Sequence, residues 1–382
     1  MTQAGAQRPW YAWLTDGSPP VEFSLHPIVV DGQEATLRVF VPAKPDGRRR
    51  PAVVMVCGLM WLGDGFLGAI GLRFNDRFGY AFARSGCPCV QIHTPSRHLA
   101  HTRIMDATAL LFLLLWPLLL IPVVRFLLVA VDVLMLATAP LQLCVAAPLL
   151  LLTGLDAMAV VAPEAAPVVV SGFWGVLALL AAHILVRALH WAGGDIPWPR
   201  RRDYLHEAAA AVKWAQGQTK LLGSDGRLVL CGYSSGGHVA ALYGLSAEAP
   251  SFAAVVLISG IYGLHTDGWT GGRRWLAPAF NMLFADILGA GSAAAREATS
   301  PEAAVGKLPA GRLKGEWYVL NARMELMGLE PFQSILFDAS PLCAGLAAKG
   351  AVVKRVACGL NHWLLIFNVE SFVRPFCEGL AE

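Results

Sequence analysis

The apolar and polar positions of the chain alternate between two patterns on either side of a long hydrophobic block. The run 51–58 is continuously apolar, which predicts a strand buried on both faces of a sheet, and the mostly apolar runs 227–234 and 253–261 predict two more strands. The segments 75–86 and 201–218 mix apolar with polar residues and indicate helices. Strands that alternate with helices predict a mostly parallel sheet with right-handed crossovers and helices on both of its faces.

Further elements complete this α/β prediction. Asp31 and Gly32 separate two strand-like segments, 23–30 and 34–42, and this dipeptide favours a tight hairpin turn. The segment 262–312 is rich in loops. More strands are expected at 87–93, 315–323 and 351–358, and more helices at 238–247, 330–350 and 364–380.

The hydrophobic block lies in the middle of the chain and predicts an inserted α-helical transmembrane region at 105–190. Its apolar segments 107–124, 126–152 and 168–189 have lengths close to or above the 20 or so residues that cross a bilayer. A very apolar cap domain or a buried core is the alternative. The charged residues between positions 107 and 190 are Arg125, Asp132, Asp156, Glu164 and Arg187.

The two flanks of the block, 1–104 and 191–382, are expected to form a single α/β domain. Both ends of the insertion then lie on one side of the membrane, so the number of spans must be even. Two spans, starting near Ala107 and Val168, are preferred over four. The flanks carry several basic residues, which by the positive-inside rule places the α/β domain in the cytosol. These residues are Arg97, Arg103, Arg187, Arg200, Arg201 and Arg202.

Composition agrees with a membrane protein and excludes other classes. Hydrophobic residues make up 55% of the chain, charged residues make up 15%, and the mean hydropathy is +0.52. A soluble domain has about 25% charged residues. The net charge of +3 is too small to indicate nucleic-acid binding. The eight cysteines have no metal-site spacing and are expected to be buried thiols in a reducing compartment. The N-terminus has no apolar core of a signal peptide.

The strongest chemical motif is Gly232-Tyr233-Ser234-Ser235-Gly236, which fits G-x-S-x-G. It lies between an apolar strand and a helix rich in small residues, where a sharp turn projects a serine above the sheet. Glycines are needed at both ends of the motif because the turn brings backbone segments close together. Ser235 does not fit, since Tyr233 would then occupy the first glycine position. Ser234 is therefore the candidate nucleophile, and an ordinary Gly/Ser turn is the alternative.

A serine nucleophile needs a base, and the base needs an orienting acid. In this type of domain both follow the serine, each after a late strand. His362 lies after the last predicted strand and is the candidate base, whereas His238, on the helix after the nucleophile, is expected to make a structural hydrogen bond. Glu325 and Glu330 follow the strand at 315–323. Glu325 is preferred as the acid because it lies closer to the strand end.

Several segments together resemble the α/β-hydrolase esterases. The most similar group includes kynurenine-formamidase-like enzymes, hormone-sensitive-lipase-like carboxylesterases and prenylcysteine methylesterases. The resemblance covers residues 50–96 and 195–375 and excludes the insertion. The segments are PAVVMVCGLMWLGDG, GYSSGGHVAAL, VVLISGIYGL, SPEAAV and GLNHWLLI.

The resemblance also implies an oxyanion hole. In these enzymes a His-Gly-Gly-Gly-type segment supplies backbone N–H groups, together with the N–H that follows the nucleophile. Here the corresponding stretch begins at Cys57 and retains one of those glycines, Gly58, so Leu59, Met60 and Ser235 are the expected backbone donors. The family's acid is usually Asp, whereas this chain has Glu325.

These observations predict a membrane-embedded serine hydrolase that cleaves a carboxylic ester of a lipophilic substrate through a Ser-His-Glu triad and an acyl-enzyme. Thioester hydrolysis, amide hydrolysis or acyl transfer by the same triad is the first alternative, and a catalytically inactive membrane scaffold is the second. Neither a metal nor an organic cofactor is expected. The expected partners are the ester substrate and membrane lipid, and no nucleic acid.

Overall fold

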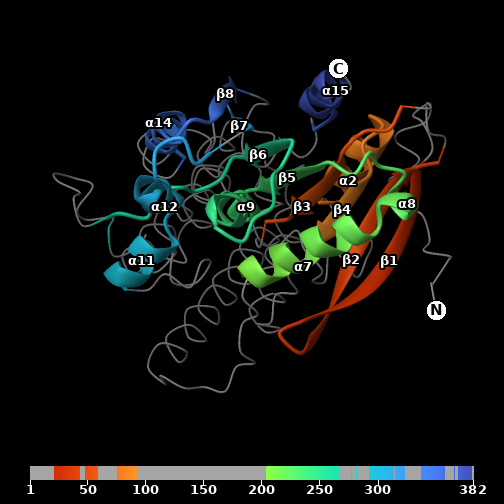
Figure 1. Ribbon diagram of the computed structural model, residues 1–382, viewed down its shortest axis with the longest axis horizontal. Coiled ribbons are helices and arrows are strands. Elements are labelled where there is room, and N and C mark those ends of the chain that lie inside the picture. The colour runs from red at the N-terminus through yellow and green to blue at the C-terminus, as the bar shows by residue number, and fades with distance from the viewer. Residues whose placement is uncertain are drawn as a thin grey trace, which may run out of the picture.

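One eight-stranded sheet with helices on both faces forms the part of the chain that the structure, a computed structural model, describes (Figure 1). The strand order is β1-β2-β4-β3-β5-β6-β7-β8. The described residues are 21–43, 48–58, 75–92, 204–266, 277, 281, 292–313, 315–322, 337–357, 365 and 369–380. The strands are β1 (Val21–Val30), β2 (Gln33–Pro42), β3 (Ala52–Val56), β4 (Cys89–Ile92), β5 (Leu228–Tyr233), β6 (Ala254–Ile258), β7 (Glu316–Asn321) and β8 (Val352–Ala357).

The N-terminal strands form the predicted hairpin at one edge of the sheet. β1 pairs antiparallel with β2, and Val30 lies opposite Gln33 across the turn. Asp31 and Gly32 both have positive φ angles, 51° and 73°. A two-residue turn of this kind requires positive φ at both positions, which explains why an Asp-Gly pair occurs there.

The strands from β3 to β8 are parallel, as the alternation of strands and helices predicts. β3 pairs with β4 on one side and with β5 on the other. β4 ends at Ile92 and the next described element begins at Tyr204, so β3 joins strands from the two flanks of the predicted insertion in one sheet. The insertion itself, 105–190, lies outside the described residues.

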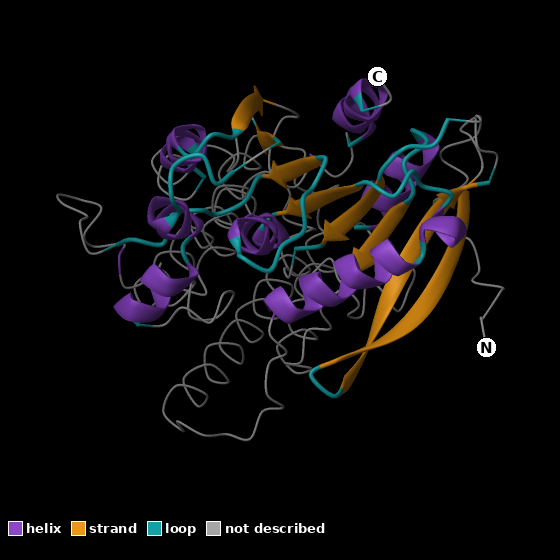
Figure 2. Cartoon of the chain, in the orientation of Figure 1, coloured by secondary structure: helices purple, strands orange, loops and turns teal. Residues whose placement is uncertain are grey.

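Helices cover both faces of the sheet (Figure 2). On one face, side chains such as Leu230 and Val239 pack with residues of α7, α9, α12 and α14. On the other face, Val229 and Cys231 pack with residues of α2 and α15. Leu230 and Val229 point to opposite faces because successive strand residues alternate. The helices are α2 (Asp76–Arg84), α7 (Tyr204–Gly217), α8 (Thr219–Leu222), α9 (Ser235–Leu245), α11 (Ala293–Thr299), α12 (Pro301–Lys307), α14 (Ser340–Ala348) and α15 (Glu370–Gly379).

Two sequence expectations differ from the structure in detail. The loop-rich stretch 262–312 contains two short helices, α11 and α12. The helix expected at 330–350 is described at its C-terminal end, where α14 begins at Ser340. Among the described helices, none is long and apolar enough to cross a membrane.

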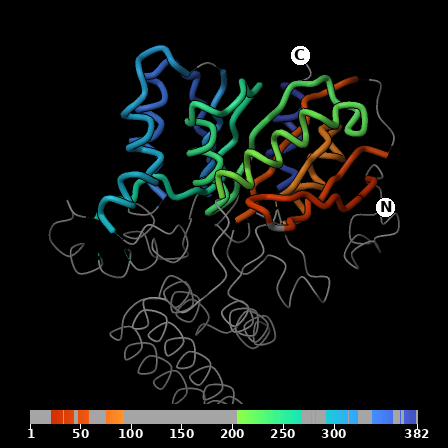
Figure 3. Tube along the Cα trace, turned by 60° about the horizontal axis from the view of Figure 1, so that its bottom comes forward, coloured from red at the N-terminus to blue at the C-terminus, as the bar shows by residue number. Residues whose placement is uncertain are grey.

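The parallel strands end at a common level, and this edge carries the candidate site. The register places Tyr233, Ile258, Leu320 and Val356 in one row across β5, β6, β7 and β8. On the other side of β5, Gly232 lies level with Val56 and Ile92. Figure 3 shows the N-terminal hairpin in red at one side of this sheet and the light-blue helices α11, α12 and α14 toward the other.

Candidate active site

Ser234 forms a strained turn between β5 and α9. Its backbone angles are φ 57° and ψ −127°, a combination that residues with a side chain rarely adopt. The Ser234 N–H donates to the Ile258 carbonyl on β6 at 2.9 Å, and the Ser234 carbonyl accepts from the Gly237 N–H at 2.9 Å. The Ser234 side chain does not cap the first turn of the described helix α9. The turn therefore holds the serine at the C-terminal edge of the sheet, with its hydroxyl not used as a helix cap.

Three glycines lie in the close packing of this turn, and at two of them, Gly232 and Gly236, no atom larger than hydrogen fits beside the Cα atom. A Cβ on Gly232 would overlap the backbone of Gly236, and a Cβ on Gly236 would overlap the Val56 carbonyl oxygen. A Cβ on Gly58 would lie 3.0 Å from the Ser234 Cβ and 3.6 Å from its Oγ. The close backbone approach expected at both motif glycines is thus present, and the end of β3 lies directly against the serine.

The structure brings three of the predicted site residues together and leaves the others outside its described part. Ser234, Ser235 and Gly58 lie at one point of the edge, where β3 ends and α9 begins. Ser235 is the first residue of α9, so its N–H lies at the positive end of the helix dipole. Glu325, Glu330, His362, Leu59 and Met60 lie outside the described residues. Glu325 and Glu330 come after the end of β7 in the chain, and His362 comes after the end of β8.

His238 has the structural role expected for it. It lies on α9, one turn after Ser234, and its Nδ1 is 2.6 Å from the Ile261 carbonyl oxygen. Burial lowers the pKa of His238 to about 4, although the carbonyls of Ile261 and Thr299 act in the opposite direction. The imidazole is therefore neutral near pH 7. The short contact with a carbonyl indicates that Nδ1 carries its proton.

Sequence reasoning missed the segment that follows β6, residues Ser259–Gly263, named here the β6 wall. Ser259 is fully buried and has a positive φ of 47°. Its N–H donates to the Leu320 carbonyl at 2.7 Å. The Gly260 N–H donates to the Tyr262 hydroxyl at 3.1 Å. The Tyr262 carbonyl accepts from the Ser300 hydroxyl at 3.1 Å, so the wall is bonded to the start of α12.

The start of α12 supports the β6 wall from its outer side. Ser300 accepts from the Ala303 N–H at 3.4 Å, and the Glu302 N–H donates to the Tyr262 carbonyl at 3.3 Å. The Glu302 carboxylate occupies the place that a side chain on Gly263 would take. Burial raises the pKa of Glu302 to about 7, and the charge of Asp338 acts in the same direction. The sequence signal for this helix start was Ser300-Pro301-Glu302, a cap residue, a first-turn proline and a first-turn acid.

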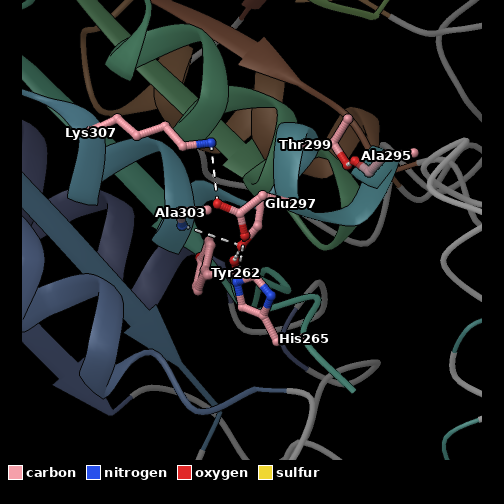
Figure 4. A network of polar contacts seen from close by, with 8 residues as sticks. Tyr262, His265, Ala295, Glu297, Thr299, Ala303 and Lys307 are labelled. Carbon is pink, nitrogen blue, oxygen red and sulfur yellow. Dashed lines mark hydrogen bonds and ion pairs between the residues drawn. The ribbon is translucent and has the colours of Figure 1, made fainter. Parts of the chain in front are cut away.

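Ion pairs continue this polar network toward the surface. Figure 4 shows Glu297 of α11 between Lys307 of α12 and His265, which follows the β6 wall. Glu297 Oε1 lies 3.2 Å from Lys307 Nζ, and Glu297 Oε2 lies 3.5 Å from His265 Nε2. These side chains are about half exposed, so the pairs contribute little stability individually. They link α11, α12 and the segment after the wall.

The cysteines have the buried character expected of them. The six that the structure describes are buried free thiols, and burial holds the pKa of Cys89, Cys231 and Cys377 well above the usual range. Such thiols are unreactive. Within the described ranges, no group of three or more His, Cys, Asp or Glu side chains is arranged to hold a metal ion.

Comparison with known proteins supports the fold. No protein-family model matches the sequence. No curated protein matches it either. The structure is similar to brefeldin A esterase, a bacterial homologue of human hormone sensitive lipase, with a TM-score of 0.54 and 18% identity over 96% of this chain and 78% of that one.

Two further solved structures have lower scores. A thermostable esterase from Pseudomonas putida has a TM-score of 0.48 and 17% identity, over 94% of this chain and 80% of that one. A hyperthermophilic esterase from the archaeon Pyrobaculum calidifontis has a TM-score of 0.48 and 16% identity, over 95% and 85%. The similarity to brefeldin A esterase, together with the sheet order, shows that this chain has the α/β-hydrolase fold.

Proposed function

We propose that the chain is a serine hydrolase that cleaves carboxylic esters, with Ser234 as the nucleophile. The observation that carries this proposal is the strained backbone of Ser234, held among Gly58, Gly232 and Gly236 at the edge of the sheet. A non-glycine residue keeps such a conformation only where its surroundings impose it, and strain of this kind concentrates at functional sites. A serine presented on a strand-to-helix turn is suited to attack a carbonyl carbon.

The proposed reaction has two half-reactions through an acyl-enzyme. Ser234 Oγ bonds to the ester carbonyl carbon while His362 takes the hydroxyl proton, and the carbonyl electron pair moves onto oxygen. When the carbonyl re-forms, the C–O bond to the alcohol breaks and His362 returns the proton to the departing oxygen. Water then repeats these steps on the acyl-enzyme and releases the carboxylic acid. Glu325 orients the imidazole and stabilises its cationic form.

The strand register supports this assignment of base and acid. Glu325 follows β7 and His362 follows β8, and both strands end level with β5. Loops that leave neighbouring parallel strands at one level start within roughly 5–15 Å of one another, given a strand spacing of about 4.8 Å. The two side chains therefore have short distances to cover to reach Ser234. Glu330 is the alternative acid in the same loop.

The proposed oxyanion hole combines the Ser235 N–H with backbone donors after β3. The start of α9 favours developing negative charge. Gly58 lies against the Ser234 side chain, so the chain that continues into Leu59 and Met60 starts at the correct place. Backbone amides serve as donors whatever their side chains are, which makes the loss of the family's other glycines tolerable.

We further propose that the substrate is lipophilic and that the 105–190 region holds the domain in a membrane, with the catalytic domain in the cytosol. The apolar segments and the basic flanks of the sequence support this placement. Ile92, the last described residue before this region, lies level with Gly232 and two strands away from it. The chain therefore leaves the sheet toward this region at the same edge as the nucleophile, at a point roughly 10 Å from it by strand spacing.

The full-length chain in detergent micelles, treated with a fluorophosphonate probe, tests the proposal. Only an activated serine reacts with such a probe, so the wild type should be labelled and should hydrolyse p-nitrophenyl esters, with longer acyl chains preferred. Ser234→Ala should abolish both. Ser246→Ala, at the other end of α9, is the matched control and should retain both. An unlabelled wild type would support the inactive scaffold instead.

Two further variants test the acid. Glu325→Gln should lower turnover, but less than replacement of Ser234 or His362, because the acid only orients the base. Glu330→Gln is the matched control in the same loop. If Glu330→Gln lowers kcat more than Glu325→Gln does, the acid is Glu330 and the hydrolase proposal stands.

A further inference from the structure

In the proposed triad, the acid and the base follow strands that are separated from β5 by β6. Ser234 follows β5, whereas the loops with Glu325 and His362 follow β7 and β8, and β6 lies between them. A triad of Ser234, Glu325 and His362 would therefore span the end of β6, where the β6 wall lies beside Ser234. The position of the wall is then expected to affect how closely the base and the acid approach the nucleophile.

Two contacts fix the β6 wall against the nucleophile helix. The first is a close approach of the two backbones, since a Cβ added to Gly237 would lie only 3.2 Å from the Gly260 Cα. The second is polar, the 2.6 Å contact between His238 Nδ1 and the Ile261 carbonyl oxygen. The close backbone approach leaves little space between the wall and α9. The hydrogen bond ties the wall to α9 and opposes its movement away.

From these contacts we propose that His238 is a positioning residue for the hydrolase reaction, holding the β6 wall at the height where the triad assembles. This inference rests on the proposed function. His238 is 2% exposed, so it does not touch a substrate at the edge of the sheet. Its effect on catalysis passes through the Ile261 carbonyl, and a shift of about 1 Å in such a support can lower turnover by about 100-fold.

The covalent geometry of three side chains makes a sharp test possible. The amide nitrogen of Asn is separated from Cβ by the same two bonds as Nδ1 of His, whereas the amide nitrogen of Gln corresponds to Nε2. His238→Asn therefore keeps a donor for Ile261, His238→Gln moves the donor toward the other side of the ring, and His238→Leu removes it. The full-length chain in micelles should be assayed with p-nitrophenyl esters, with rates normalised to folded protein.

We expect kcat to fall about 10- to 100-fold in His238→Leu and His238→Gln while KM changes by less than about twofold, because the chemical step is affected. His238→Asn should restore kcat to within about threefold of the wild type. His206→Leu, which removes an exposed imidazole on α7, is the control and should leave kcat unchanged. Loss of stability with unchanged kcat, or failure of Asn to restore activity, would overturn the proposal.

Amide hydrogen exchange separates this inference from the proposed function. The peptide that covers the β6 wall should exchange faster in the Leu and Gln variants and at the wild-type rate in the Asn variant. If the wild type hydrolyses no ester, the proposed function fails, and the exchange rates still decide whether His238 holds the wall. Unchanged exchange in His238→Leu would refute the positioning role.

Discussion

The nucleophile turn and the β6 wall lie side by side at the edge of the sheet, but they are held in place by different forces. Close packing fixes the turn, since Gly232 and Gly236 leave no room for a methyl group and Gly58 leaves little. Hydrogen bonds fix the wall, through His238 on one side and Ser300 and Glu302 on the other. Two of these wall supports belong to residues whose side chains titrate between pH 4 and 7.

Because of this difference, the turn and the wall should respond differently to pH and to mutation. Steric contacts do not depend on protonation, so the geometry of the turn should be the same across the working pH range. At the wall, the supporting His238 imidazole and the Glu302 carboxylate beside Gly263 can change charge, and a buried charge without a partner is costly. Substitutions that enlarge a side chain should therefore disturb the turn, whereas changes of pH should disturb the wall.

The largest expected effect is that of a methyl group in the turn. Gly236→Ala places a Cβ into the Val56 carbonyl oxygen, and because that oxygen belongs to the backbone, the overlap is relieved only if the backbone moves. We therefore expect the free energy of unfolding to fall by at least about 3 kcal/mol. Fluorophosphonate labelling should be lost with it. Thermal unfolding and labelling measure the two effects.

A matched glycine makes this result interpretable. Gly306 of α12 is exposed, and no atom lies within 4 Å of the place that a Cβ would take there, so Gly306→Ala should be neutral or slightly stabilising. Wild-type labelling in Gly236→Ala would show that the backbone of the turn can accommodate a methyl group, and it would contradict the prediction.

The next effect is a loss of stability in acid that originates at the wall. With a pKa of about 4 in the folded protein and 6.5 in the unfolded chain, His238 takes up protons more readily when unfolded. Its contribution is complete above pH 6.5 and is lost as the pH falls toward 4, by at most about 3 kcal/mol. Denaturant unfolding between pH 7 and 4 measures this. His238→Asn should lose this part of the pH dependence, and an unchanged slope would contradict the assignment.

The smallest effect has the opposite sign and comes from the outer side of the wall. The raised pKa of Glu302, about 7 against 4.5 in the unfolded chain, means that stability is highest below pH 4.5 and falls as the pH rises through 7. Glu302→Gln should therefore stabilise the protein at pH 8 and have little effect at pH 5. We expect a gain within about 1 kcal/mol, because partial exposure screens the charge. Melting temperatures at the two pH values measure it, with Glu297→Gln, an exposed acid on α11, as the control.

The sheet was predictable from sequence because its signals are local. Short apolar or mostly apolar runs predicted β3, β5 and β6, and Asp31-Gly32 predicted the hairpin. The helices α11 and α12 were not predicted because each has seven residues, too few to show an apolar period. Their caps, Ser292 and Ser300, were the available signals, since each accepts a backbone N–H of the first turn.

The part of the candidate site that could be predicted is the nucleophile turn, because the same short motif contains the reactive serine and the glycines that shape the backbone around it. The spacing of Gly232, Ser234 and Gly236 encodes the turn directly, because the glycines are required by the contacts that shape it. The β6 wall was not predictable, because the contact between His238 and Ile261 joins residues from separate elements. No local sequence pattern indicates such a contact. His362 and Glu325 remain predictions from chain order.

The pairing of β3 with β5 has a consequence for the order of events during synthesis. Ala52 lies opposite Leu228, so 176 residues (228 − 52) are translated between the two partners. At about 5–20 residues per second this takes roughly 9–35 s. During that time β3, which is buried on both faces in the finished sheet, can pair with β4 on one side but lacks its other neighbour, β5. The nucleophile turn can form only after this interval, so the whole hydrophobic block leaves the ribosome before the catalytic domain can close.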